Sequence, residues 1–321
     1  MPPARHSQPA AELVVFGEFF LEMVFYDVAE TPRFGTEVRA GRFSETPGGG
    51  LATTAIVASR LGTRTAAVSR VGRDALGEPS WERLRQARVD TSASEIRADL
   101  STAITVCVAH RRERLMVTWD PINRNLEKLF ERPRVKAVLR RARHLHLACA
   151  FREPRRWRLI LRRLRQAGMS ISADIGWNPD LFRRQDLQEL LQQIDFIFPN
   201  EMEARALTGE STTVQALRTL ARWVKQPVVK LGDRGSITLT EGKTVMAGTL
   251  QVNVVDATGS GDAFDGGFLH GYLRGWDGED CLRAGNVCGA LATTGPGGSA
   301  DPPGARRLAR LMRTLEEGRR R

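Results

Sequence analysis

The feature that most constrains the fold is a regular alternation of short apolar runs with helical patterns along most of the 321 residues. Runs with the length and composition of strands cover residues 13–17, 65–71, 144–148, 170–175, 194–198 and 227–231. Helix-period segments lie among them, at residues 52–61, 76–87, 134–142, 154–167, 187–191, 201–207 and 214–224. Because this alternation is typical of a mostly parallel sheet with helices on both faces, we expect an α/β fold. A hairpin over 236–248 and two long helices, from Asp262 and from Asp280, are expected in the last third.

Two segments interrupt this alternation. Residues 33–44 and 103–119 have the period-two pattern of strands, and the second predicts a hairpin around Arg111–Arg114. Neither segment has a crossover helix, so we expect them to form a small antiparallel sheet that covers a cleft, although they could instead extend the main sheet. The expected organisation is a disordered tail over 1–11, a main domain over 12–32, 45–99 and 120–321, and a β-sheet lid over 33–44 and 100–119.

Composition narrows the functional classes. No apolar run approaches the roughly 18 residues that a membrane span needs, and the first residues lack the apolar core of a secretory signal. The four cysteines lie far apart without a CxxC pair, which argues against a zinc cluster or a disulfide framework. We therefore expect a cytoplasmic protein without a membrane partner.

The net charge of +11 raises the question of nucleic-acid binding. Of the 48 basic residues, 43 are arginine, and they lie on the polar faces of amphipathic helices such as residues 155–168. No aromatic residues alternate with them and no nucleic-acid motif is present. The charge therefore predicts a solvated basic surface and no specific nucleic-acid partner.

The sharpest motif is VVDATGSGDAFDGGFLHGYLRG, residues 254–275. Small residues at Gly259, Ser260 and Gly261 leave backbone N–H groups uncovered at the start of a helix, where they attract a negatively charged group. Asp262 lies in the first turn of that helix, an ordinary place for a capping carboxylate. It could equally act as a base for a hydroxyl beside an anion hole, and spacing alone leaves both interpretations open.

Further chemistry-bearing residues follow other predicted strands. Residues 46–62 open a helix after Gly48, Gly49 and Gly50, and VGRDALG at 71–77 ends a strand shortly before Asp74. In FPNEMEARALTG, Asn200 and Glu203 begin a helix, where the carboxylate could serve the helix dipole or orient a Mg²⁺-bound water. Loops at the carboxyl ends of parallel strands line the ligand crevice, so these groups are expected near one another.

Competing motifs fail on inspection. Gly242-Lys243-Thr244 imitates the end of a P-loop, but position 237 is Ile where the first glycine is required. No GxGxxG follows the first strand. His144 and His146 could share one strand face, yet no third ligand is near in sequence, which favours a role in the core or behind the site over metal binding.

Taken in order, these elements resemble the ribokinase-like carbohydrate kinases, also called PfkB-type sugar kinases, from about Leu13 to Pro302. The first family signature is matched by the glycine segment, its helix through Gly62 and the VGRDALG that follows. The second is matched by DATGSGD at 256–262, preceded by VVKLGDRG and followed by GNVCGALATTGPGG. The resemblance implies a ribokinase-like α/β fold whose central, mostly parallel sheet has helices on both faces and a small β-sheet lid.

The resemblance also implies the reaction, which is transfer of the ATP γ-phosphoryl group to a primary hydroxyl. The family aspartate that matches Asp262 is the catalytic base, and Gly259, Ser260 and Gly261 match the anion hole. The resemblance further implies that the nucleotide contacts Asn200, Gly232, Asp233, Gly235 and Asn286. It implies that Glu203 binds Mg²⁺ through water, and that Asp256 and Thr258 help to hold a monovalent cation such as K⁺. The family lid often forms the dimer interface, so a homodimer is expected.

Two departures from the family lie on the substrate side. Glu22 stands where the family usually has an aspartate that grips sugar hydroxyls, and Thr53 stands where it has an asparagine. Together with Gly48 and Gly49 they are expected to line the sugar pocket, while the residues for phosphoryl transfer match the family. The departures therefore predict a reshaped sugar pocket in an active enzyme.

The leading hypothesis is an ATP-dependent kinase for a small sugar or sugar derivative, similar to fructokinase, 2-keto-3-deoxygluconate kinase or ribokinase. One alternative is a nucleoside kinase of the same fold, for which Phe19, Phe20, Trp119 and Trp177 could supply an aromatic slot for the base. Another is a non-catalytic sugar-sensing or nucleic-acid-binding protein. The presence of Asp262 argues against that class, because a sensor does not need a base.

Overall fold

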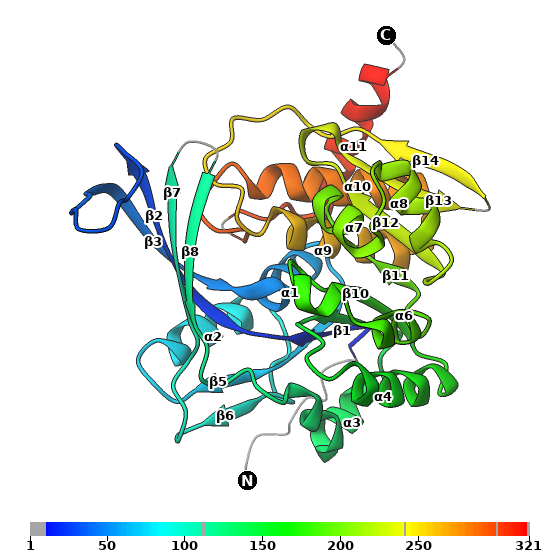
Figure 1. The fold of residues 1–321 in the computed structure, drawn as a ribbon, viewed down its shortest axis with the longest axis horizontal. Helices are drawn as coiled ribbons and strands as arrows, with labels where there is room; N and C mark the ends of the chain where they lie inside the picture. Colours follow the sequence, from blue (N-terminus) through cyan, green and yellow to red (C-terminus); the bar gives the residue numbers. More distant parts are fainter. Residues whose placement is uncertain (1–10, 111–112, 241, 300, 320–321) are drawn as a thin grey trace.

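The computed structural model describes residues 11–110, 113–240, 242–299 and 301–319. Its centre is an eight-stranded sheet in the order β14-β13-β12-β11-β10-β9-β1-β4 (Figure 1). The strands are β1 (Leu13–Gly17), β4 (Thr65–Val68), β9 (His144–Ala148), β10 (Ser170–Asp174), β11 (Phe196–Ile197), β12 (Gln226–Lys230), β13 (Ser236–Thr240) and β14 (Lys243–Ala247). Neighbours from β4 to β12 pair in parallel, and only β13 and β14 are antiparallel. The predicted mostly parallel sheet is confirmed, and Gly242-Lys243-Thr244 begins a hairpin strand.

Helices cover both faces of this sheet, as its doubly buried strands require. Side chains alternate along β1, so Val14 and Phe16 contribute to one apolar core and Leu13 and Val15 to the other. The first core takes side chains from α3 (Pro133–Leu139), α4 (Pro154–Gln166), α6 (Gln185–Leu191), α7 (Glu201–Thr208) and α8 (Thr213–Leu220). The second takes them from α1 (Gly49–Arg60), α2 (Gly77–Gln86), α9 (Ser260–Leu273) and α10 (Gly278–Ala292), and α11 (Ala305–Arg319) packs beside α10. Shorter elements are α5 (Pro179–Phe182), η1 (Leu126–Glu131) and η2 (Gly232–Arg234).

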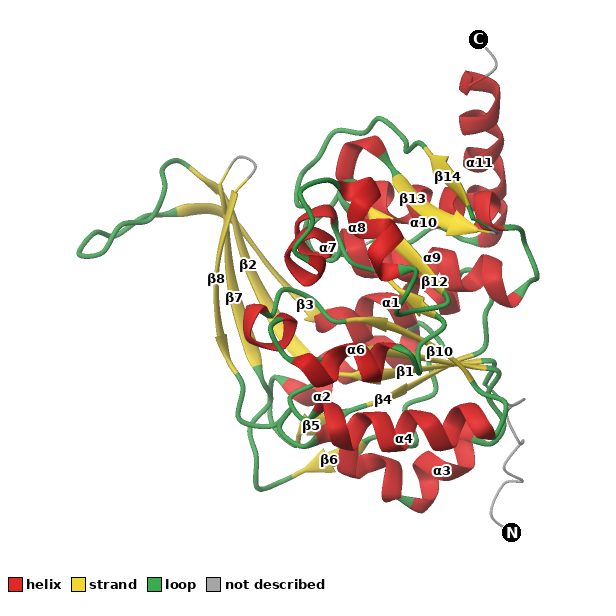
Figure 2. Ribbon diagram, turned by 45° about the vertical axis from the view of Figure 1, so that its right-hand side comes forward, coloured by secondary structure: helices red, strands yellow, loops and turns green. Residues whose placement is uncertain are grey.

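A four-stranded sheet stands off the main body and forms the lid (Figure 2). Its order is β3-β2-β7-β8, with β2 (Phe20–Val28), β3 (Ala40–Gly48), β7 (Ile104–His110) and β8 (Glu113–Trp119). Three expectations need correction: residues 20–28 and 45–48 belong to this sheet and not to the main domain, residues 33–39 form no strand, and β2 pairs with β7 in parallel. The first error arose because only Glu18 and Phe19 separate β1 from β2, without a glycine or proline to mark the turn.

The predicted strand 65–71 is also divided in the structure. It becomes β4 and β5 (Arg70–Gly72), and β5 pairs with β6 (Glu95–Arg97) in a separate two-stranded sheet. Ser69 lies at the break, where its hydroxyl donates to Gly17 O at 2.7 Å. The chain therefore leaves the main sheet at this point and enters the two-stranded sheet.

Two sequence-based expectations fall partly outside the described residues. They are the predicted tail over 1–11, of which only Ala11 is described, and the tip of the β7–β8 hairpin at 111–112. Within the described part of the chain, none of the helices combines the length and the apolar character needed to cross a membrane.

Candidate active site

The carboxylate of Asp262 lies where the first turns of α9 and α1 meet. A side-chain carbon at Gly50 would stand 2.7 Å from Asp262 Oδ1, and the Thr54 hydroxyl donates to Asp262 O at 2.9 Å. The Asp262 carboxylate accepts no hydrogen bond from the described residues, and no side chain caps the α9 N-terminus. Asp262 lies in the first turn of α9, as the capping interpretation requires, but its carboxylate binds no backbone N–H and is free to contact a ligand, so both interpretations stay open.

The loop before α9 depends on glycine. Gly259 has a φ of +69°, and a side-chain carbon there would stand 2.7 Å from the Cα of Gly298. This close approach of two backbones leaves no room for a side chain. The N–H groups of Gly259, Ser260 and Gly261 thus lie at the open start of a helix, where a negative charge is favoured.

Burial and neighbouring charges raise the pKa of Asp262 to about 7. Desolvation contributes most, followed by the negative charge of Asp174, while the ammonium of Lys230 opposes the shift. Glu22 and Glu203 add smaller repulsions. A carboxylate that exchanges its proton near pH 7 is suited to general base catalysis.

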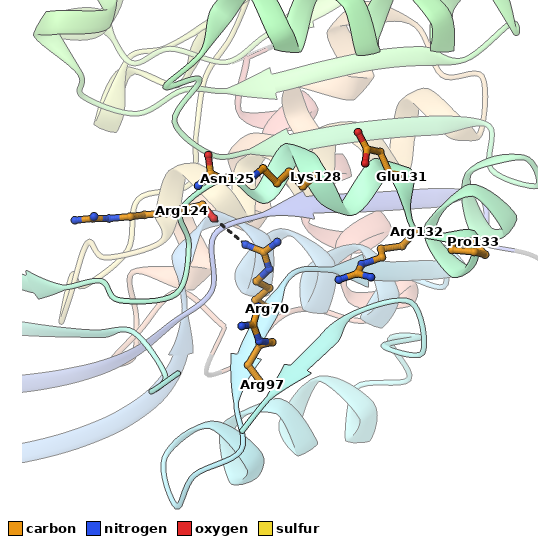
Figure 3. Close-up of a pocket in the computed structure, with 8 residues that line it drawn as sticks. All are labelled: Arg70, Arg97, Arg124, Asn125, Lys128, Glu131, Arg132 and Pro133. Carbon is orange, nitrogen blue, oxygen red and sulfur yellow. Dashed lines mark hydrogen bonds between the residues drawn. The ribbon is translucent and has the colours of Figure 1, made fainter. Parts of the chain in front are cut away.

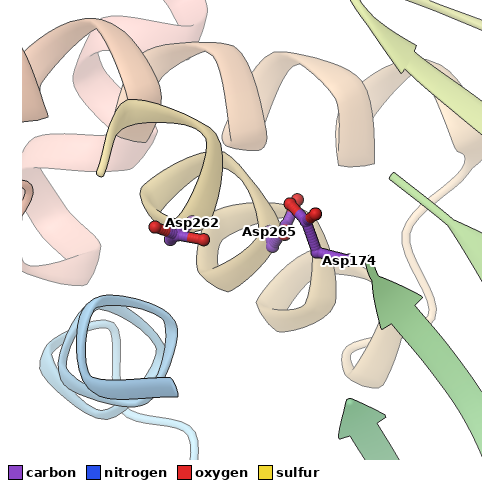
Figure 4. Close-up of side chains that lie close together, drawn as sticks. All are labelled: Asp174, Asp262 and Asp265. Atoms are coloured by element: carbon purple, nitrogen blue, oxygen red, sulfur yellow. The ribbon is translucent and has the colours of Figure 1, made fainter. Parts of the chain in front are cut away.

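Beside Asp262 lies a buried charge cluster that consists of Asp174, Lys230 and Asp265, and Figure 4 shows its two aspartates next to Asp262. Lys230 Nζ is 2.7 Å from Asp174 Oδ2 and 3.4 Å from Asp265 Oδ1. One carboxylate oxygen from each of Asp174, Asp262 and Asp265 falls within 4.8 Å of the others, and the Lys230 ammonium supplies the compensating cation. Although burial alone would lower it, the Asp174 and Asp265 charges raise the pKa of Lys230 well above its ordinary range, so the side chain stays charged.

This cluster was missed at the level of sequence. Lys230 and Asp174 end the apolar strands β12 and β10, and Asp265 follows Asp262 by three positions on the same helix face. A charged residue at the carboxyl end of a buried parallel strand is the signal that could have identified two of the three.

On the predicted substrate side, Glu22 lies against Gly48 and Gly49. Gly49 N donates to Glu22 Oε1 at 3.3 Å, and a side-chain carbon at Gly48 would stand within 2.5 Å of the Glu22 carboxyl. Burial raises the pKa of Glu22. Thr53 is buried in α1, and a side-chain carbon at Gly259 would stand 3.3 Å from its hydroxyl. Thr53 therefore borders the anion-hole loop, which places it nearer the reacting groups than expected.

On the predicted nucleotide side, a cavity of about 780 Å³ is lined by residues that include Asn200, Lys230 and Gly232. Asn200 and Glu203 form a reciprocal cap of α7, with Glu203 N donating to Asn200 Oδ1 and Asn200 N donating to Glu203 Oε2, both at 2.8 Å. Glu203 Oε1 accepts no hydrogen bond from the described residues, so one oxygen stays available. Burial raises the pKa of Glu203.

Other predicted nucleotide residues shape the backbone. Gly232 and Gly235 have φ values of +63° and +89°, on either side of Asp233 in η2. The Asn286 amide donates to Ala247 O at 2.9 Å and to Gly248 O at 3.0 Å, so both of its N–H groups are used to hold that segment. Asn286 therefore holds the end of β14 and the residue after it in place through its side chain.

Asp256 joins two loops that meet behind the anion hole. Asp256 Oδ1 accepts from Thr258 N at 2.9 Å and Thr258 Oγ1 at 2.7 Å, and Oδ2 accepts from Gly297 N at 3.0 Å. From the lid, Arg114 Nη1 donates to Thr258 Oγ1 at 3.2 Å. The lid thus reaches the same loop as Asp262 through an arginine that sequence reasoning did not single out.

The two histidines behave as polar core residues. His144 Nε2 and His146 Nδ1 both share the Ser172 hydroxyl, at 2.7 and 2.8 Å. His146 Nε2 lies 3.9 Å from Asp265 Oδ2, so β9 borders the charge cluster from behind. Burial lowers the pKa of His146 to about 3, which keeps the imidazole neutral.

Comparison with known proteins bears on the family and the fold. A family model described as "pfkB family carbohydrate kinase" matches residues 10–304. The cytidine kinase of Thermococcus kodakarensis is 29% identical over 251 residues, which cover 76% of this chain and 87% of that protein. The 2-dehydro-3-deoxygluconokinase of Bacillus subtilis is 27% identical over 314 residues, which cover 94% and 95%. Among solved structures, a protein of E. coli described as a ribokinase II, in complex with ATP and Mg²⁺, superposes with a TM-score of 0.81 at 22% identity over 95% of this chain and 99% of that chain.

Proposed function

Because the chain belongs to the pfkB family of carbohydrate kinases, we propose that it transfers the γ-phosphoryl group of ATP to a hydroxyl of a small sugar or sugar derivative. The observation that carries this proposal is the place of Asp262. Its carboxylate is free of hydrogen bonds from the described residues and faces Gly50 across the meeting point of α1 and α9. It also lies within the same turn as the N–H groups of Gly259 and Gly261, which have no acceptor among the described residues, whereas Ser260 N donates to Ala257 O at 3.4 Å.

In the proposed reaction, the ionised Asp262 carboxylate accepts the proton of the attacking hydroxyl. The N–H groups of Gly259, Ser260 and Gly261 stabilise the charge on the phosphoryl group in transit, because they are already oriented and need no rearrangement. Lys230 adds a positive charge next to Gly261, since a side-chain carbon at Gly261 would stand 3.0 Å from Lys230 Nζ. Glu22, Gly48, Gly49 and Thr53 are proposed to contact the sugar.

The nucleotide is proposed to bind on the side of Asn200, Gly232, Asp233, Gly235 and Asn286. The cavity shared by Asn200, Lys230 and Gly232 supports this side, as does the ATP-bound relative of the same fold. Glu203 fits a role with Mg²⁺, because its Oε1 is available and Mg²⁺ prefers carboxylate and water oxygens. When bound, Mg²⁺ neutralises charge on the phosphates.

A monovalent cation at Asp256 and Thr258 would have few side-chain ligands. Asp256 Oδ1 accepts two hydrogen bonds, and Thr258 Oγ1 donates to Asp256 while it accepts from Arg114. Asp256 Oδ2 accepts one hydrogen bond, from Gly297 N, and keeps a lone pair for a cation. The proposed reaction includes no step that needs K⁺.

The lid is proposed to form a homodimer interface. Its strand β8 exposes apolar side chains at alternate positions, with Leu115 48%, Val117 62% and Trp119 56% accessible, and Phe43 of β3 is 49% accessible. An exposed apolar group on a single projecting sheet indicates a partner surface. Sedimentation equilibrium of the wild type against Val117→Arg tests this: the wild type should sediment as a dimer and the variant as a monomer.

A nucleoside kinase is the second candidate, favoured by the similarity to a cytidine kinase. Its aromatic slot cannot include Phe19, which is buried in the core against Trp81 at 4.8 Å between ring centroids. Trp119 and Trp177 remain exposed. A coupled ADP-release assay over sugars, sugar acids, sugar phosphates and nucleosides separates the two candidates. Turnover confined to sugars or their derivatives supports the proposal, and turnover confined to nucleosides contradicts it.

A further inference from the structure

A second pocket, remote from every residue assigned above, gathers basic side chains. It has a volume of about 630 Å³, and the residues that line it come from β5, β6 and the segment 124–133 (Figure 3). Five of them are basic, namely Arg70, Arg97, Arg124, Lys128 and Arg132, and Glu131 is the acidic one. Elsewhere the arginines spread over helix faces, whereas here several of them line one concavity, although the Arg124 side chain extends away from Arg70 (Figure 3).

A single carboxylate holds three of these guanidinium groups together. Arg70 Nε is 2.7 Å from Glu95 Oε2, Arg132 Nη2 is 2.9 Å from Glu95 Oε1, and Arg97 Nη1 is 4.0 Å from Glu95 Oε2. The three positive charges lower the pKa of Glu95 in spite of its partial burial, so it stays ionised. Asp99 pairs with Arg97 alone. The acids therefore leave an excess of positive charge in the pocket.

Arg70 is buried and held in a fixed position in this pocket. It is 8% exposed, and its Nη1 donates to Arg124 O at 2.7 Å while its Nε is bound to Glu95. Its Nη2 makes no hydrogen bond with the described residues. The guanidinium is thus fixed by two bonds and keeps a donor for a ligand, and such a planar fork suits phosphate oxygens.

The geometry points to a binding site for a small phosphorylated metabolite with at least two negative charges, such as a bisphosphate or a nucleotide, outside the candidate active site. The volume suits a molecule of that size. A polyvalent anion is favoured because the excess positive charge is distributed over several guanidinium groups. The inference does not depend on the proposed kinase reaction, since none of the lining residues belongs to it.

The pocket is joined to the root of the lid. Arg124, whose carbonyl binds Arg70, follows Asn123, and the Asn123 side chain accepts from Phe19 N at 3.4 Å and donates to Phe19 O at 3.2 Å. Glu18 and Phe19 connect β1 with the lid strand β2. A ligand in the pocket therefore binds the same segment that anchors the lid.

The test is calorimetric titration of the full-length protein with inorganic pyrophosphate, while a non-hydrolysable ATP analogue and Mg²⁺ saturate the nucleotide side. The pocket variant is Arg97→Gln with Arg132→Gln, because both side chains are partly exposed and their removal should leave the fold intact. The matched control is Arg141→Gln with Arg162→Gln, which removes the same charge from exposed positions elsewhere. Citrate, a polyanion without phosphate, serves as the comparison ligand.

We expect one saturable site per chain in the wild type and in the control. The pocket variant should lose affinity by about tenfold or more, because charge-assisted hydrogen bonds to a phosphate disappear. Equal losses in the pocket variant and the control would show a non-specific charge effect and overturn the inference. Equal affinity for citrate would overturn the assignment to phosphorylated ligands, and absence of saturable binding would overturn the site itself.

Discussion

The ammonium of Lys230 lies 2.7 Å from Asp174 Oδ2, and it is the buried cation among the carboxyl groups that surround Asp262. Asp174 ends β10, Lys230 ends β12, and Asp262 and Asp265 lie in α9, so three elements hold the charges in place. Because like charges disfavour ionisation, Asp262 can act as a base near neutral pH only while this cation is present.

Lys230→Met should therefore impair Asp262 as a base although Asp262 itself is unchanged. With the cation gone, Asp174, Glu22 and Glu203 repel the Asp262 carboxylate uncompensated, so its pKa rises and the ascending limb of kcat/KM moves to higher pH. We also expect a loss of about 3–5 kcal/mol in unfolding free energy, the usual cost of leaving buried charge unpaired. Lys230→Arg, which keeps the charge, is the control for both readouts. If a folded Lys230→Met protein keeps the wild-type pH profile, Lys230 does not influence the pKa of Asp262.

The pH dependence of the wild type follows from the pKa of Asp262. A raised carboxyl pKa of about 7 means that the group is protonated, and cannot accept a proton, below neutral pH. The value of kcat/KM should rise about tenfold per pH unit below that point and level off above it. Burial also raises the pKa of Glu18 to about 7, so Glu18→Gln is the control. The inflection should persist in Glu18→Gln; its disappearance there would assign it to Glu18.

Gly50→Ala tests whether the position of the Asp262 carboxylate matters. The new carbon would stand 2.7 Å from Asp262 Oδ1, so the carboxylate must move, and a displacement of this order lowers kcat by up to about 10²-fold. Stability should fall slightly, because the new carbon would also stand 3.1 Å from Ala148 Cβ, a contact tighter than ordinary packing. Gly248→Ala, with no atom within 4 Å of the new carbon, is the control for activity. Full activity in Gly50→Ala would show that Asp262 is not confined as described.

Glu22→Asp should alter substrate choice. Glu22 packs against Gly48 and accepts from Gly49, so shortening it by a methylene moves one acceptor in the proposed sugar pocket. A mismatch of this kind changes discrimination by about 1–3 kcal/mol, measured as relative kcat/KM across the sugar panel. Thr53→Asn serves for comparison, because its proximity to Gly259 predicts a lower kcat on every substrate. If the relative kcat/KM values across the sugar panel are unchanged in Glu22→Asp, Glu22 does not contact the substrate.

Much of the fold could be predicted from periodicity. Buried parallel strands are continuous apolar runs, and each was separated from the next by a helical pattern, so β1, β9 and β10 were expected close to their observed bounds. The lid strand β2 could not be separated from β1 in this way, because the chain changes sheets over two residues without a turn signal. Its pairing with β7 connects residues far apart in sequence, and no local pattern reports such a contact.

The candidate site could likewise be predicted from the sequence only in part. Asp262, Gly259 and Asn200 stand out in sequence because they occupy the starts of helices after glycine-rich or apolar segments. Lys230, Asp174 and Asp265 do not, since the importance of each depends on the other two across three elements. For Thr53, the sequence suggested a sugar contact, and only the packing of α1 against α9 brings its hydroxyl beside Gly259.

The measurement that tests the central claim most directly is turnover by Asp262→Asn on whichever substrate the panel identifies. The amide keeps the shape of the side chain but cannot accept a proton, so kcat should fall by about 10²–10⁴-fold. Binding of ATP, measured separately by calorimetry, should stay near that of the wild type, because the nucleotide side is lined by residues of other elements. A folded Asp262→Asn protein that retains nearly the wild-type kcat would contradict the assignment of Asp262 as the base.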